Sequence, residues 1–228
     1  MITRMGILEK SNSMTEEEFN DYWLNIHGPL VRDFDCLRKY HQNHIVDREQ
    51  RGISYPRSSQ VVDGFSELWF DDVKAMENCF NADALHVLKE DESKFLQNVP
   101  IIVARQNIVV PPPEDDEKYV KRMTLLKRRF DIDVEEFQHQ WENVHGELVK
   151  TMPGIKGYIQ NVIIDRELRG KKANYEDIPI DGIVEFWFDS KGCIEKAFHS
   201  PEGRKTMEHS ESFLEEITTF LVKTHKIK

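Results

Sequence analysis

Cysteines are few in this sequence of 228 residues, and they follow no spacing pattern. The three present, Cys36, Cys79 and Cys193, give neither a disulfide framework nor a zinc motif, so we expect reduced thiols. No apolar run approaches the length of a membrane span, and the first residues do not resemble a signal peptide. These absences predict a cytoplasmic protein with no membrane partner.

Basic charge is also scarce, because 31 Lys and Arg residues face 41 Asp and Glu residues and the net charge is −10. Nucleic acids and anionic membrane surfaces need a basic face, so we expect neither as a partner. The sequence contains no glycine-rich phosphate loop, no serine nucleophile motif and no repeated carboxylate–histidine cluster. We therefore expect no nucleotide chemistry, no common hydrolase, no metal and no cofactor.

What the sequence does contain is an internal duplication. A shift of 118 residues aligns residues 2–110 with 120–228 without a gap, and it pairs Trp23 with Trp141 and Trp69 with Trp187. The joint is a proline-rich and acidic stretch that favours an extended, solvated backbone. We predict a first repeat over 1–110, a linker over 111–117 and a second repeat over 118–228.

Each repeat has the pattern expected of a β-α-β-β-α-β unit. In the first, strands are expected over residues 2–9, 37–47, 65–70 and 101–109, and the second helical stretch over 73–96, broken near 81–83. In the second repeat, the later elements are expected over residues 154–165, 183–188, 190–214 and 217–224. An antiparallel sheet with two helices on one face leaves its other face bare, so the second copy is expected to cover it, sheet against sheet, as a sandwich or barrel.

The first helix of each repeat should begin at a cap. Thr15 with Glu18 matches a capping box, and Asp133 with Glu136 repeats it. Apolar residues then recur at helical spacing and predict a buried face, in the two copies Phe19, Trp23, Ile26, Leu30, Val31 and Phe137, Trp141, Val144, Leu148, Val149. We expect Pro29 to disturb the first helix and the second, with Glu147 at that place, to be straighter.

A histidine and a tyrosine are the best candidates for catalysis. His27 lies four residues after Trp23, on the same helical face, and Tyr40 follows thirteen residues later; His145 and Tyr158 repeat the pair. A neutral histidine can accept a proton and a tyrosine hydroxyl can stabilise an oxyanion, which suits enolisation or lactone rearrangement. The alternative is a hydrogen-bonded structural histidine and a tyrosine stacked in the sheet.

Further polar and aromatic residues lie at matching places in the two repeats. Because side chains alternate along a strand, Gln42 should share a face with Tyr40, and Asn43 should point the other way. The candidate ligand-binding residues are Trp23, Trp69, Trp141, Trp187, Gln42, Asn43, Gln160 and Asn161.

Two pairs of charged residues also repeat. Arg48 and Arg166 suit either carboxylate binding or solvated ion-pair turns. Glu67 and Glu185 precede the strand tryptophans and suit either a base with a raised pKa or an ion pair with arginine.

The pattern F-x-x-x-W-x-x-x-H-G-P-L from Phe19, the tyrosine thirteen residues after the histidine, and D-G-x-x-E-L-W-F from Asp63 resemble the EthD-like family. That family belongs to the dimeric α+β barrel superfamily and includes methylmuconolactone methylisomerase. The resemblance implies an α+β fold: two ferredoxin-like (βαββαβ) repeats packed sheet-to-sheet as an intrachain dimeric α+β barrel. It also implies functional roles for His27 with Tyr40 and His145 with Tyr158, and pockets that the loops 52–62 and 170–180 reshape or close.

The function expected first is a cofactor-independent isomerase, lyase or cyclase acting on a small cyclic or aromatic compound. Trp23 and Trp69 with their partners would line an apolar wall. A carrier or sensor of small hydrophobic ligands and a monooxygenase of the same superfamily, haem-dependent or cofactor-free, are the alternatives. The repeats form a pseudo-dimer that permits a homodimer without requiring one, and one repeat can catalyse while the other completes the sheet.

Overall fold

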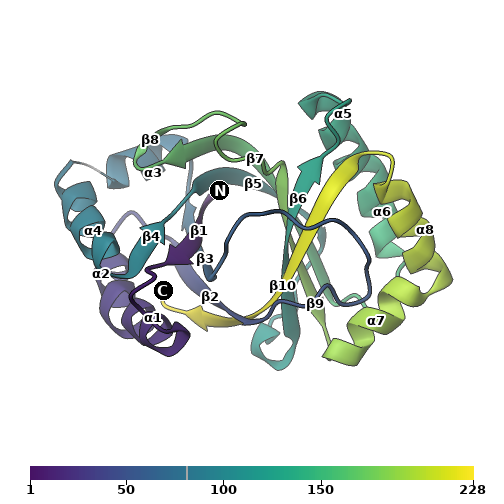
Figure 1. Ribbon diagram of the computed structural model, residues 1–228, viewed down its shortest axis with the longest axis horizontal. Coiled ribbons are helices and arrows are strands. Elements are labelled where there is room, and N and C mark those ends of the chain that lie inside the picture. The colour runs from purple at the N-terminus through teal and green to yellow at the C-terminus, as the bar shows by residue number, and fades with distance from the viewer. Residues whose placement is uncertain (81) are drawn as a thin grey trace.

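The computed structural model describes residues 1–80 and 82–228 and contains one large sheet with helices on two sides (Figure 1). The strands are β1 (Ile2–Lys10), β2 (Lys39–Asp47), β3 (Gly64–Phe70), β4 (Leu96–Asn98), β5 (Ile101–Val110), β6 (Val120–Arg128), β7 (Gly157–Leu168), β8 (Lys171–Lys172), β9 (Gly182–Phe188) and β10 (Leu214–Lys226). The α-helices are α1 (Glu16–Tyr22), α2 (Gly28–Arg32), α3 (Val73–Cys79), α4 (Ala82–Phe95), α5 (Val134–His139), α6 (Gly146–Lys150), α7 (Lys191–His199) and α8 (Pro201–Ser210). Among the described residues, no helix combines the length and the apolar character needed to cross a bilayer.

Eight of the strands close into a barrel. Each repeat supplies four antiparallel strands, in the orders β2-β3-β1-β5 and β7-β9-β6-β10. The edges of the two sheets pair with one another, β5 with β7 and β2 with β10, so no edge of either four-stranded sheet is left open. The inner faces also pack together, since Met5 and Phe65 share a cluster with Met123 and Ile183. The sequence predicted the facing sheets but not the hydrogen-bonded edges.

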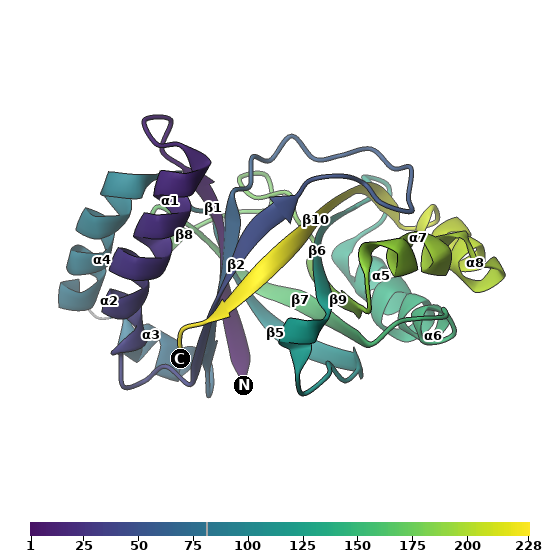
Figure 2. The ribbon, with the colours of Figure 1, turned by 90° about the horizontal axis from the view of Figure 1, so that it is seen from below.

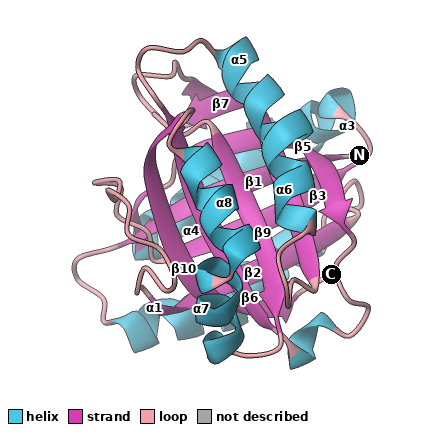
Figure 3. Ribbon diagram, turned by 90° about the vertical axis from the view of Figure 1, so that its right-hand side faces the viewer, coloured by secondary structure: helices cyan, strands magenta, loops and turns pink. Residues whose placement is uncertain are grey.

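The helices form two layers outside the barrel, one over each repeat (Figure 2). Helices α1, α2, α3 and α4 cover the first repeat, and α5 to α8 cover the second. Figure 3 shows α6 and α8 side by side over the outer face of the second sheet. Each layer buries an aromatic residue pair from the first helix against the strands, Phe19 with Trp23 and Phe137 with Trp141.

The first helix of each repeat contains a π-helical segment, Trp23–His27 in one and Gln140–His145 in the other. The Gly28 amide donates to the Trp23 carbonyl, five residues back, and Gly146 does the same to Trp141. The prediction of a straighter second helix is therefore wrong. Pro29 is not the cause of the distortion, since Pro29 lies in the first turn of α2 and Glu147 occupies the matching place in α6.

The π-helical turn also changes which residues face the core. Trp23, His27 and Val31 are buried at intervals of four, whereas Ile26 and Leu30 are 49% and 41% exposed. The wider π-helical turn shifts the buried face by one residue. Ile26 and Leu30, three residues after Trp23 and His27, therefore point toward solvent. Val144 is exposed in the second repeat for the same reason.

The helix caps agree in part with the sequence. Thr15 and Glu18 form the full capping box. Asp133 accepts from the Glu136 amide, but the Glu136 carboxylate accepts from Gln140 one turn on. The predicted break near 81–83 lies between α3 and α4, and its Asn81 is outside the described residues.

Cys36 and Cys79 form a disulfide, with Cα atoms 5.7 Å apart. The expectation of three reduced thiols is wrong for this pair, because the end of α3 folds back onto the residues that precede β2. Cys193 is free. Spacing along the chain gave no sign of a pair separated by 43 residues.

Candidate active site

The histidine and tyrosine of each repeat lie between the outer face of the sheet and the helix layer. In the first repeat, Gln42 links the tyrosine to the start of the π-helical turn: its Nε2 donates to the Trp23 carbonyl over 2.8 Å and to the Tyr40 hydroxyl over 2.9 Å. Gln160 makes the matching bonds in the second repeat, 2.7 Å to Trp141 and 3.0 Å to Tyr158. Glutamine thus holds the carbonyl at the start of the π-helical turn and places the tyrosine beside it.

In the first repeat, a buried carboxylate orients the histidine. His27 Nδ1 lies 2.8 Å from Asp91 Oδ2, and the Tyr22 hydroxyl donates to Asp91 Oδ1 over 2.7 Å. Burial lowers the pKa of His27, and Asp91 opposes that effect without reversing it. The imidazole is therefore neutral at pH 7, and Asp91 fixes its proton on Nδ1, which leaves the Nε2 lone pair free to accept a proton.

The second repeat lacks this carboxylate. His209 occupies the place of Asp91, and its Nδ1 lies 3.4 Å from Nδ1 of His145. Burial, together with the neighbouring His209, lowers the pKa of His145 to about 3. Among the residues that the structure describes, no anion contacts His145, whereas His27 has the anionic partner that supports a general base.

Both tyrosines keep their protons. Burial raises the pKa of Tyr40 and of Tyr158 well above the ordinary value of 10.0. Their hydroxyl oxygens accept hydrogen bonds, from Gln42 in one repeat and from Gln160 and Trp141 in the other. Each O–H is left to donate, and each tyrosine lines the same cavity as its histidine.

Each site has a small cavity next to a larger groove. The cavity at His27 and Tyr40 measures about 30 Å³, and the one at His145 and Tyr158 about 40 Å³. The adjoining grooves measure about 540 Å³ and 570 Å³. Phe80 and Leu88 line both spaces in the first repeat, so their movement would join the cavity to the groove.

The long loops cross from one repeat to the other. The loop between β2 and β3 extends over the second repeat (Figure 2). The Tyr55 hydroxyl donates to the Leu214 carbonyl over 3.1 Å, and residues 52–55 line the groove of the second repeat. Residues 169–172 line the groove of the first. Each loop therefore shapes the pocket of the opposite repeat.

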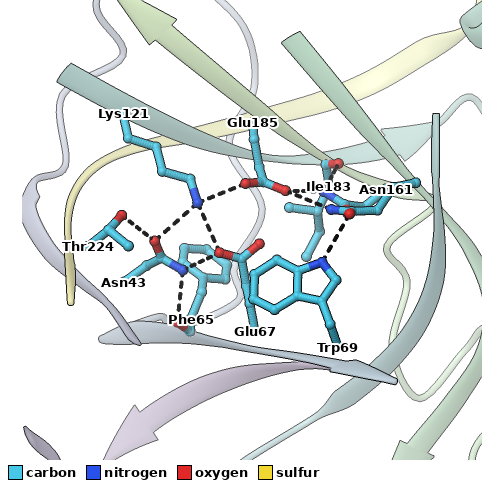
Figure 4. Close-up of polar contacts among 10 residues, drawn as sticks. Asn43, Phe65, Glu67, Trp69, Lys121, Asn161, Ile183, Glu185 and Thr224 are labelled. Atoms are coloured by element: carbon cyan, nitrogen blue, oxygen red, sulfur yellow. Dashed lines mark hydrogen bonds and ion pairs between the residues drawn. The ribbon is translucent and has the colours of Figure 1, made fainter. Parts of the chain in front are cut away.

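The strand tryptophans and asparagines lie on the other face of the sheet, inside the barrel. Trp69 Nε1 donates to Gln106, and Trp187 lies beside Lys121, whose Nζ is 5.1 Å from the ring centroid. Asn43 donates to Glu67 over 2.6 Å and Asn161 to Glu185 over 2.8 Å (Figure 4). Trp69 and Trp187 therefore do not share a wall with Trp23 and Trp141. The separation of Gln42 from Asn43 is as predicted.

Lys121 links the two buried glutamates. Its Nζ lies 2.9 Å from Glu67 and 2.7 Å from Glu185, one from each repeat (Figure 4). Burial and the nearby Glu67 raise the pKa of Glu185 although Lys121 lowers it. The expected arginine partner is thus a lysine, and the carboxylates are remote from the histidine cavities.

The repeated arginines hold loop ends. Arg48 donates to the Val62 carbonyl and pairs with Asp63. Arg166 donates to the carbonyls of Ile178 and Ile180 over 3.2 Å and 2.7 Å. Neither carboxylate binding nor a solvated ion-pair turn describes these contacts fully, because most of the acceptors are backbone carbonyls.

Sequence reasoning missed Asp91 and His209. Both occupy matching positions in the duplication, and Asp91 lies between Leu88 and Phe95 on the buried stripe of α4. A lone acidic residue at helical spacing among apolar ones was the available signal. Arg4 and Arg122 were missed as well, at matching positions in the first strand of each repeat.

The EthD domain model matches the chain twice, over residues 11–98 and 129–217. The chain belongs to the EthD domain family. No curated protein matches it significantly.

Several solved structures share the fold of this EthD protein over nearly the whole chain. An anthrone oxidase-like protein has 9% identity and a TM-score of 0.67, covering 99% of this chain and 93% of its own. A candidate monooxygenase from Lactobacillus acidophilus has 11% identity and a TM-score of 0.58, covering 100% and 94%. A DypB variant from Rhodococcus jostii in complex with heme has 10% identity and a TM-score of 0.54, covering 97% and 93%. At these identities the likeness establishes the fold alone.

Proposed function

We propose that this EthD protein is an enzyme that removes a proton from a small cyclic or aromatic compound in the first repeat and passes the resulting carbanion to molecular oxygen. The observation that carries the proposal is the buried pair of His27 Nδ1 and Asp91 Oδ2, 2.8 Å apart, beside Tyr40. A structural histidine would also need hydrogen bonds. A general base, however, typically has a carboxylate partner that fixes its tautomer and stabilises the imidazolium, and Asp91 is such a partner.

The proposed substrate carries an acidic C–H bond conjugated with a ring carbonyl. His27 Nε2 takes the proton, and Asp91 stabilises the imidazolium that forms. The Tyr40 hydroxyl donates to the carbonyl oxygen, where the negative charge collects. With anthrone as substrate, oxygen oxidises the carbanion: one oxygen atom becomes the second quinone carbonyl, and the other leaves as water with the two hydrogens of the CH₂ group.

The choice of oxygen as acceptor rests on the structural neighbours, among which are a candidate monooxygenase and an anthrone oxidase-like protein. An isomerase or lyase would share the proton removal and return the proton to another atom. A carrier would need the aromatic residues but not the His27–Asp91 pair, so that pair supports turnover.

A haem does not fit this site. The DypB structure holds one, but the cavity beside His27 measures about 30 Å³, which is comparable with the share of one water in the liquid, about 30 Å³. Movement of Phe80 and Leu88 would admit an aromatic ring from the adjoining groove, but the closed cavity has no room for a porphyrin. No step of the proposal therefore passes through haem.

The proposal includes the wider organisation of the chain. We take repeats 1–110 and 118–228, joined by 111–117, as a single-chain counterpart of a dimeric α+β barrel in the cytoplasm. The pseudo-dimer is complete in one chain, so a homodimer is permitted but not required.

The test is oxygen uptake and quinone formation with anthrone under air and under nitrogen. His27→Gln should lower kcat by about 10²- to 10⁴-fold, the usual contribution of a general base. His139→Gln, on an exposed side chain of α5, should leave turnover unchanged. Oxygen-independent conversion to an isomer would establish the isomerase instead. A loss with His145→Gln but not with His27→Gln would place the site in the second repeat and contradict the proposal.

Asp91 is a positioning residue, and its effect is best seen in a pH profile. Asp91 raises the pKa of His27, so Asp91→Asn should lower that pKa further. The acid limb of kcat/KM should then move to lower pH while the plateau falls. A limb that stays in place, or moves to higher pH, would show that Asp91 does not act through His27.

A further inference from the structure

Arg122 on β6 is buried in the cavity of the second repeat, where the described residues give it no counter-ion. The side chain is 2% exposed and lines the cavity with His145 and Tyr158. One Nη donates to the Arg51 carbonyl over 3.1 Å, and the guanidinium lies 4.7 Å from the Phe198 ring centroid. Within residues 1–80 and 82–228, Nε has no hydrogen-bond acceptor.

The matching arginine of the first repeat is compensated. Arg4 lies 3.4 Å from Glu167, and Glu92 lines the same cavity. In the second repeat, Ser210 replaces Glu92 and His209 replaces Asp91. Among the described residues that line the second cavity there is no carboxylate. The two cavities therefore share the cation and differ in the anions that line them.

The guanidinium is charged at neutral pH despite its surroundings. Burial lowers the pKa of Arg122 to about 9, which is still above 7. A buried charge without a partner is costly, and such groups ordinarily pair with an anion. The first repeat shows that the fold can supply one, so a cavity lining without an anion is specific to the second site.

A second polar group faces the same cavity without a partner. Thr124 Oγ1 is buried and, in the described part of the chain, has no hydrogen-bond partner. Gly6 occupies its place in the first repeat, so this hydroxyl too is a feature of the second site. The cavity thus offers a charged fork, a hydroxyl and the Tyr158 O–H, all suited to an oxyanion.

We propose that the second repeat binds the carboxylate group of a small organic acid, held by Arg122 and Thr124. A cavity of about 40 Å³ admits the carboxylate alone. Ile53, Met207 and Phe198 line both the cavity and the groove of about 570 Å³, so the body of the acid extends past them into that groove. The proposal does not depend on the reaction assigned to the first repeat.

The experiment compares benzoate with its uncharged analogue benzamide by thermal shift and calorimetry. Benzoate should raise the melting temperature of the native protein by mass action, and benzamide should not. Arg122→Met should weaken benzoate binding at least tenfold. It should also raise the melting temperature of the ligand-free protein, because it removes an unpaired buried charge. The matched control, Arg4→Met in the first repeat, should leave the benzoate response in place.

A second variant covers the case in which Arg122→Met does not fold. Thr124→Val keeps the side-chain volume, and it should weaken benzoate several-fold without changing the response to benzamide. Equal responses to benzoate and benzamide, or none to either, would overturn the proposal. So would a benzoate response that survives Arg122→Met and is lost in Arg4→Met. Sulfate or chloride that binds in competition and more tightly would show an inorganic-anion site and overturn the carboxylate assignment.

Discussion

Single substitutions between the two repeats decide what each site can do. Asp91 gives His27 an anionic partner, and His209 at the same position leaves His145 with another imidazole. Arg4 pairs with Glu167, whereas no carboxylate of the described residues pairs with Arg122. Matching elements carry these residues in both repeats, so the chemical difference between the sites lies in a few side chains.

A prediction at this scale concerns the glycine after each histidine. A Cβ at Gly28 would lie 3.0 Å from Gln42 Nε2 and 3.3 Å from the Trp23 carbonyl, whereas at Gly146 the nearest atom is at 3.5 Å. Gly28→Ala should therefore disturb the glutamine contact and destabilise the protein. Gly146→Ala should be neutral or stabilising by up to about 1 kcal/mol, the helical preference of alanine over glycine. Urea unfolding of both variants tests this, and equal effects would contradict it.

At the scale of elements, the π-helical turn and the strand beneath it form one unit. The turn brings Trp23 and His27 onto the same buried face, and the glutamine of the neighbouring strand binds the carbonyl at its start. Such turns are rare in proteins, and those that occur often lie at functional sites. Their recurrence in the second repeat shows that the turn belongs to the fold and does not depend on Pro29.

Gln160→Leu should destabilise the protein by about 1–3 kcal/mol, because the buried Trp141 carbonyl and Tyr158 hydroxyl each lose one of their two donors, and a buried hydrogen bond contributes about 0.5–1.5 kcal/mol. The control is Asn143→Leu on the same turn, whose exposed amide contacts His139. Urea unfolding at 25 °C gives both values. If Gln160→Leu costs no more than Asn143→Leu, the glutamine does not support the turn.

At the scale of the whole molecule, Lys121 joins the repeats inside the barrel. It lies between Glu67 of one repeat and Glu185 of the other, and Thr3 occupies its place in the first repeat. One lysine for two carboxylates leaves the cluster short of positive charge. This shortage favours the protonated form of Glu185, in which burial and Glu67 raise the pKa to about 7.

A pH dependence of stability follows. The pKa of Glu185 is near 4.5 in the unfolded chain and about 7 in the folded protein. Its protonated form therefore stabilises the folded state fully below pH 4.5, and this contribution is lost as the pH rises through about 7. Lys121→Thr should remove the counter-charge and cost about 3–5 kcal/mol at pH 8, which lies above the raised pKa of Glu185. At pH 5 the loss should be smaller, because protonation takes the place of the lysine. Urea unfolding at the two pH values checks this, and an equal loss at both would rule out the ionic role.

The sequence by itself determined the features that repeat or alternate locally. The duplication gave the two units, the strand period placed Gln42 and Asn43 on opposite faces, and Thr15 with Glu18 marked a helix start. These signals depend on residues close together in the chain, where helix and strand geometry fixes the direction of each side chain.

The tertiary structure alone decided the contacts between distant segments. It brought Asp91 to His27, Cys79 to Cys36 and residues 52–55 to the opposite repeat, and it paired the sheet edges to close the barrel. Such contacts depend on how α4 crosses the sheet and on where each loop ends. No periodicity in the sequence records these arrangements, because they arise from the packing of whole elements against one another.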